Sequence, residues 1–96
     1  MGILFAFLII ASDGHDMEAR GIGAMMAASA ECGFKLDEEL LRQILRRAEN
    51  RYPGFAEDVA YAMGRAIERI RQAPPKWRAA HCADMRQDAK DSDWAK

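Results

Sequence analysis

Apolar residues recur at helical spacing over most of the chain, in stretches separated by glycines and prolines. The clearest stretch follows Asp37, which suits an N-cap, while Glu38 and Glu39 suit a first helical turn because their charge complements the helix dipole. Pro53 ends the stretch. The pattern predicts a helix over residues 37–51. Its apolar stripe consists of Leu40, Leu41, Ile44, Leu45 and Ala48.

Two more helices are predicted after this one, on either side of Pro74-Pro75. The first covers residues 55–72, and the second covers residues 76–90, since proline is favoured at the first positions of a helix. The apolar face of the first consists of Phe55, Val59, Ala62, Met63, Ala66, Ile67 and Ile70. From about residue 91 the chain is polar, with Trp94 as its one large apolar side chain, and we expect a mobile tail.

Near the N-terminus the pattern predicts a helix over residues 17–32. Asp16 can cap its start, and Gly33 suits the left-handed residue that follows a helix end. Gly21 and Gly23 each weaken such a helix by about 1 kcal/mol relative to alanine, unless a neighbouring helix needs close approach there.

The composition agrees with a single all-helical domain. The chain has 96 residues, of which 50% are hydrophobic and 30% charged, as in globular proteins. We expect an all-α fold, a small four-helix bundle. Its helices are predicted at about 17–32, 37–51, 55–72 and 76–90. The net charge of −1 gives no general attraction to nucleic acid or to anionic membranes.

Residues 2–11 form a continuous apolar run at the start of the chain. The run is too short to span a bilayer, which needs about 20 residues, but it fits the apolar region of a secretory signal. No Lys or Arg precedes it, so a hydrophobic arm or a strand stays open. We therefore divide the chain into an apolar leader, residues 1–12 (signal-peptide remnant or hydrophobic arm), and one helical domain, residues 13–96. The protein is expected to be periplasmic or secreted if the leader is a signal remnant, and cytoplasmic if it is not; membrane contact would involve the uncleaved leader alone.

Cys32 and Cys82 are the two cysteines, and His81 beside Cys82 invites comparison with a catalytic Cys–His pair. Neighbours on a helix point about 100° apart, so these two side chains cannot act on each other as nucleophile and base. Two cysteines are also too few for a structural zinc site without histidines. We predict a Cys32–Cys82 disulfide in an oxidising compartment, joining the first helix to the last.

Other chemistry finds little support in the sequence. Residues 13–16 with Glu18 carry oxygen donors but lack the ligand spacing of a calcium loop. The second and third predicted helices are spaced like a helix-turn-helix, yet Glu57 and Asp58 open the third and would repel phosphates. Phosphate loops and nucleophile elbows are missing from the sequence. We predict a non-catalytic protein without cofactor, metal or nucleic-acid partner.

Methionine is abundant for so short a chain, with six residues. Because methionine packs adaptably, such residues can line a groove for variable partners, although ordinary core packing is the simpler explanation. The candidate apolar interaction surface consists of Met25, Met26, Met63, Met85 and Trp77. We expect the partner to be another protein, a second copy of the chain included.

The segment from His81 to Lys90 (HCADMRQDAK), followed by Trp94, carries a family resemblance. With one cysteine pair, four predicted helices and a charged tail, the chain resembles the small periplasmic acid-stress chaperones of the HdeA type. It is also similar to small, helical, disulfide-tied periplasmic immunity proteins. The first resemblance implies a chaperone that loosens below about pH 3–4 as carboxylates protonate, and the second a toxin-neutralising protein. Our main expectation is a secreted or periplasmic protein-binding module.

Overall fold

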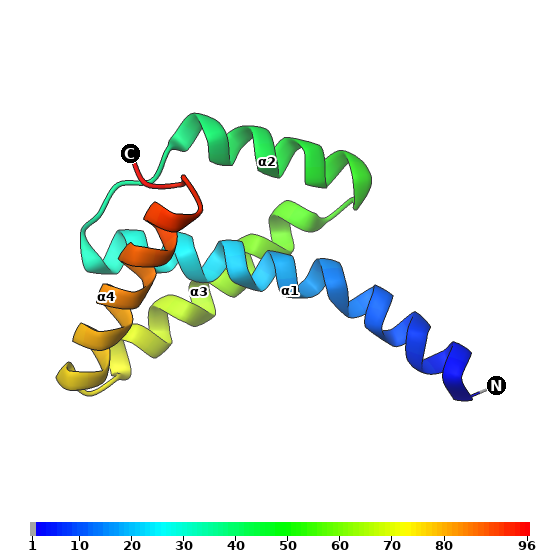
Figure 1. The fold of residues 1–96 in the computed structure, drawn as a ribbon, viewed down its shortest axis with the longest axis horizontal. Helices are drawn as coiled ribbons and strands as arrows, with labels where there is room; N and C mark the ends of the chain where they lie inside the picture. Colours follow the sequence, from blue (N-terminus) through cyan, green and yellow to red (C-terminus); the bar gives the residue numbers. More distant parts are fainter. Residues whose placement is uncertain (1) are drawn as a thin grey trace.

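The computed structural model describes the backbone of residues 2–96 and the side chains of residues 15–96. It contains four α-helices and confirms the predicted all-α, four-helix fold (Figure 1). The helices are α1 (Gly2–Cys32), α2 (Glu38–Arg51), α3 (Phe55–Gln72) and α4 (Pro75–Asp91). The observed bounds of the last three agree with the predicted ones to within a residue, because proline, glycine and the Asp37 cap mark their ends.

The first helix is longer than predicted, since α1 begins at Gly2 rather than near residue 17. Asp16, expected at the N-cap, lies inside the helix, where its Oδ1 is 3.6 Å from Nε2 of His15. No proline occurs between residues 2 and 16, so the helical hydrogen bonds can continue through this polar stretch. In Figure 1 the first half of α1 extends away from the other helices. Whether residues 1–12 are a signal remnant or an arm stays a prediction.

α1 and α3 form the most extensive helix pair of the structure, and α3 crosses α1 in Figure 1. The two helices come close together at Gly23. A Cβ atom placed on this glycine would lie 2.8 Å from the Ala62 Cβ, from the Met63 backbone nitrogen and from the Val59 carbonyl oxygen. Gly23 is therefore a position where a neighbouring helix needs close approach, as the sequence analysis allowed for. Gly21 has open space around it.

The core lies around this crossing, and α2 and α4 contribute little to it. Its buried cluster consists of Ala19, Ile22, Met25, Leu36, Leu41, Phe55, Val59 and Ala89. Within it, Leu41 is the buried residue of α2 and Ala89 that of α4. Half-buried residues of the two helices pack against this cluster as well: Ile44, Leu45 and Ala48 of α2 and Met85 of α4.

A disulfide and two arginines attach α4 to the rest of the domain. Cys32, the last residue of α1, is bonded to Cys82 of α4 across a Cα–Cα distance of 5.6 Å, which confirms the predicted pair. Arg86 donates to the Cys32 carbonyl oxygen at 3.1 Å. Arg78 donates to three carbonyl oxygens at the end of α3, one of which, that of Ile70, also accepts from the Ala73 N–H at 3.3 Å. These acceptors belong to Ile70, Arg71 and Ala73.

Glu49 of α2 stabilises the start of α3. The residue before α3, Gly54, has a φ of 93° and no side chain to cap the helix. Glu49 takes over this role: its carboxylate accepts from the Gly54 N–H at 2.9 Å and from the Ala56 N–H at 2.8 Å. These backbone donors lower the pKa of Glu49 from its ordinary value of 4.5.

The C-terminal tail, which the sequence predicts to be mobile, is hydrogen bonded to the segment between α1 and α2. The Asp37 N–H donates to the Trp94 carbonyl oxygen at 2.7 Å, and the Lys96 N–H donates to the Lys35 carbonyl oxygen at 3.1 Å. The Trp94 side chain packs against the core. The tail is thus held both by the Trp94 side chain and by backbone hydrogen bonds. The backbone hydrogen bonds could not be predicted from the pattern of side chains.

Candidate functional site

The five predicted interaction residues do not form one surface. Met25 is 7% exposed and belongs to the core. Met85 is half-buried and packs on the core from α4. Trp77, in the first turn of α4, is 41% exposed, and its ring stacks on His81 with centroids 4.6 Å apart. Helical periodicity cannot separate these cases, because it fixes the face of a helix but not what covers that face.

Met26 of α1 and Met63 of α3 are the two that the fold brings together. Both are half-buried and line a single hollow of about 510 Å³, which we call the methionine groove. Its apolar wall also includes Phe34, Leu36 and Leu41, and the charged residues Lys35, Glu38 and Lys96 border it. The volume falls within the range of roughly 300–1,000 Å³ that is usual for ligand sites.

The turn after α1 places Phe34 and Leu36 in the groove. Gly33 adopts a φ of 75°, which favours glycine, and its N–H donates to the Ser29 carbonyl oxygen at 3.1 Å. The Phe34 N–H donates to the same oxygen, and the Ser29 hydroxyl donates back to the Phe34 carbonyl oxygen. Both ends of the turn are thereby fixed. The Phe34 ring is also covered by the Arg86 guanidinium, whose Cζ is 5.5 Å from the ring centroid.

The remaining wall of the groove depends on the start of α2 and on the C-terminus. The Asp37 carboxylate accepts from the Leu40 N–H at 3.1 Å, which confirms Asp37 as N-cap and fixes the turn that carries Leu41. Pairing of residues 35–37 with residues 94–96 sets Lys35 next to Lys96 at the rim. Segments from five parts of the chain therefore form the groove, namely α1, the turn after it, the start of α2, α3 and the C-terminus, which explains why no local motif points to it.

The methionine groove presents apolar contact surface rather than reactive groups. Within residues 15–96 no three His, Cys, Asp or Glu side chains lie close enough to hold a metal ion. Cys82 is in the disulfide and His81 is stacked on Trp77, so they do not form a thiolate–imidazole pair. Within residues 2–96 no helix combines the length and the apolarity that crossing a bilayer requires. The chain matches no protein-family model, no curated protein and no solved structure.

Proposed function

We propose that the protein is a non-catalytic protein-binding module of an oxidising compartment, and that its methionine groove receives apolar side chains from a helix of its partner. One observation carries this proposal: Met26 and Met63, from different helices, line the same groove with Phe34 and Leu41. Methionine is unbranched and polarisable, so a wall of this kind adapts to different apolar side chains. A partner helix with apolar residues one turn apart suits it.

The rim of the groove indicates the charge of the partner. Lys35 and Lys96 are exposed and joined by a backbone hydrogen bond, so two positive side chains lie side by side at the rim, where Glu38 is the acidic side chain. Charge complementarity favours a partner helix whose apolar anchors are flanked by acidic residues. We also propose a periplasmic or secreted location, because a structural disulfide suits an oxidising compartment and the sequence of residues 1–12 fits a signal remnant.

The methionines themselves serve as reporters of this binding. We would label the oxidised protein with methyl-¹³C methionine and titrate it with a helical peptide that carries leucines one turn apart and flanking glutamates. The methyl signals of Met26 and Met63 should shift. Those of Met17, 67% exposed outside the groove, and of buried Met25 should not. Equal shifts at Met17, or no shift at Met26 and Met63, would contradict the proposal.

A matched pair of variants distinguishes binding in the groove from non-specific hydrophobic binding elsewhere on the protein. Met63→Gln keeps the length of the side chain but places an amide in the groove, and it should weaken peptide binding about tenfold because the lost apolar burial is worth about 1.5 kcal/mol. Met17→Gln makes the same change on an exposed side chain and should leave the affinity unchanged. A peptide with glutamines in place of the leucines should not bind either protein.

An acid-activated chaperone remains the second candidate function, and the cap at α3 is the observation that favours it. Protonation of Glu49 below its lowered pKa removes the charge that holds the start of α3. Such a chaperone would suppress aggregation of a client near pH 3 and not at pH 7. If the protein binds the peptide at pH 7 but does not reduce client aggregation at pH 3, it is a binding module and not a chaperone. A toxin-neutralising protein would be one kind of binding module.

A further inference from the structure

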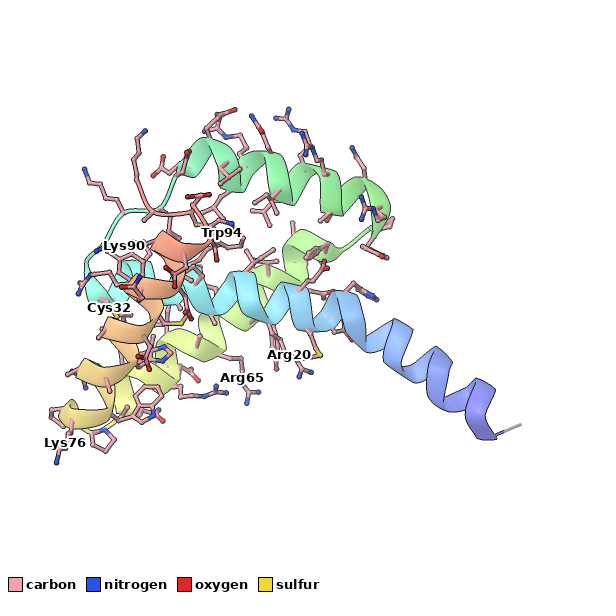
Figure 2. The ribbon with its side chains drawn as sticks, in the orientation of Figure 1. Arg20, Cys32, Arg65, Lys76, Lys90 and Trp94 are labelled. Carbon is pink, nitrogen blue, oxygen red and sulfur yellow. A yellow bond between two sulfur atoms is a disulfide. The ribbon has the colours of Figure 1, made fainter. Side chains whose placement is uncertain are left out.

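A second hollow, of about 600 Å³, lies between α1 and α3, and we call it the arginine groove. Its apolar lining is made of small side chains: Ala19, Ala24, Ala62 and Ala66. Three arginines also line it, Arg20 from α1 and Arg65 and Arg69 from α3. Figure 2 shows Arg20 and Arg65 reaching to the same side of the fold, away from α2. It is a different surface from the methionine groove, with which it shares no lining residue.

None of the three guanidinium groups of the arginine groove forms an ion pair with a carboxylate that the structure describes. Among the side chains of residues 15–96, the ion pairs join His15 to Asp16, Arg42 to Glu39 and Arg71 to Glu31, and none includes the three arginines of the groove. Other arginines are occupied within the fold, as Arg78 and Arg86 are with carbonyl oxygens. The guanidinium groups of the arginine groove are therefore not held in ion pairs by the described side chains and can bind a ligand.

Tyr61 orients one of these arginines. Its hydroxyl accepts from Arg65 Nη1 at 3.3 Å, and the Arg65 Cζ lies 5.9 Å from its ring centroid. The hydrogen bond to Tyr61 favours the charged guanidinium and, with the nearby charge of Glu68, raises the pKa of Arg65. Tyr61 is 68% exposed and lines the same groove. Exposed tyrosine beside arginine is the residue combination that dominates protein-binding surfaces.

Charge changes sign along the arginine groove, which limits what can fill it. Asp16 and Asp58 line it together with the arginines, and Asp58 precedes Arg69 by eleven residues of α3, or about 16 Å of helix. A nucleic acid, with phosphates at every step, would meet both aspartates while following the arginines. A ligand with acidic groups at the arginine end only avoids this repulsion.

The spacing of Arg65 and Arg69 along α3 suits a peptide ligand. Four residues of helix separate them by about 6 Å along the axis. In an extended peptide, alternate side chains point the same way and are about 6.6 Å apart, so two acidic residues at positions i and i+2 match the two guanidiniums. The alanine lining leaves room for the peptide backbone. We infer that the arginine groove binds an extended peptide segment with acidic residues at alternate positions, a site that does not depend on the methionine groove.

Fluorescence anisotropy with a labelled seven-residue peptide that carries glutamates at two alternate positions and alanines elsewhere, amidated at its C-terminus, tests this site. The oxidised protein at low salt should bind it in preference to the peptide with glutamine in place of glutamate. Arg65→Gln with Arg69→Gln should weaken binding about tenfold, since each exposed pair is worth up to about fivefold. Arg46→Gln with Arg47→Gln makes the same charge change on exposed α2 residues and should leave binding unchanged. Arg20→Gln, on α1, should weaken it up to about fivefold.

Several results would overturn the inference. Equal weakening by both double variants would show an effect of net charge only, and an unchanged affinity of Arg20→Gln would show that α1 takes no part. Displacement of the peptide by sub-millimolar inorganic phosphate, or tighter binding of a single-stranded oligonucleotide through the same arginines, would assign the groove to phosphate. Binding of the glutamate peptide that persists above 1 M salt would also contradict it, because exposed ion pairs are screened there.

Discussion

Gly23 and Gly21 lie two residues apart in α1, and we predict that the same substitution has opposite effects on the free energy of unfolding at the two positions. At Gly23 an alanine Cβ would lie 2.8 Å from the Val59 carbonyl oxygen and from the Met63 backbone nitrogen. Backbone atoms of a packed helix cannot swing aside as a side-chain tip can, so α1 and α3 must move apart. At Gly21 nothing lies within 4 Å of the added Cβ.

The size of each effect follows from two terms. Alanine favours a helix over glycine by about 1 kcal/mol, and this gain applies at both positions. Overpacking a close contact costs about 1–3 kcal/mol, and contact with backbone atoms places Gly23 at the upper end. Gly23→Ala should therefore destabilise the protein by about 2 kcal/mol, and Gly21→Ala should stabilise it by about 1 kcal/mol. For a domain of this size these values correspond to a Tm about 10 °C lower and about 5 °C higher.

Urea and thermal unfolding, followed by circular dichroism at 222 nm, measure both changes in the oxidised protein. Gly64→Ala provides a second control, because Gly64 of α3 also has nothing within 4 Å. It should behave as Gly21→Ala does. The reasoning is refuted if Gly23→Ala is as stable as Gly21→Ala, since α1 and α3 would then not touch at Gly23.

Two further predictions concern the ends of α3. Glu49→Gln should lower the Tm by a few degrees at pH 7, because a neutral amide caps α3 less well than the carboxylate. Folding lowers the pKa of Glu49, so the stabilisation by its carboxylate is complete above about pH 4.5 and is lost as the pH falls through the folded-state pKa. The Tm difference between wild type and Glu49→Gln should therefore shrink over that pH range. A constant Tm difference from pH 7 to pH 3 would contradict this. Arg78→Gln removes the donor from three carbonyl oxygens at the other end of α3 and should cost about 1–2 kcal/mol in urea unfolding. Arg47→Gln, an exposed change on α2, should cost under about 0.5 kcal/mol, and equal losses would show that Arg78 contributes nothing as a cap.

The helices after residue 36 were predictable because their ends carry strong local signals. Asp37, Pro53-Gly54 and Pro74-Pro75 each act on the backbone of their own segment, and the structure has the helix ends there. The start of α1 was not predictable in this way. Residues 13–16 look like a linker by their polarity, but polar residues do not stop a helix when no proline or cap competes with its hydrogen bonds.

The two grooves depend on helix pairing, which the sequence does not encode locally. The closest helix neighbours are α1 and α3, which are not consecutive, so nothing in the pattern places Met26 beside Met63 or Arg20 near Arg65. Two signals were nevertheless present. Arg65 and Arg69 at i and i+4 share a face of α3, and Gly23 is a glycine in the middle of a helix, which usually has a packing reason.

The Cys32–Cys82 bond closes a loop of 50 residues and attaches α4, in which Ala89 is the one buried residue. Its removal should cost about 4 kcal/mol by the loop-entropy model, or about 20 °C in Tm. The most direct measurement is thermal unfolding of the protein with and without reductant, with the oxidation state checked by intact mass. We predict a Tm about 20 °C lower on reduction, and the same loss in Cys32→Ser with Cys82→Ser. Equal Tm values for the oxidised and reduced protein would contradict the role of this bond in holding the domain together.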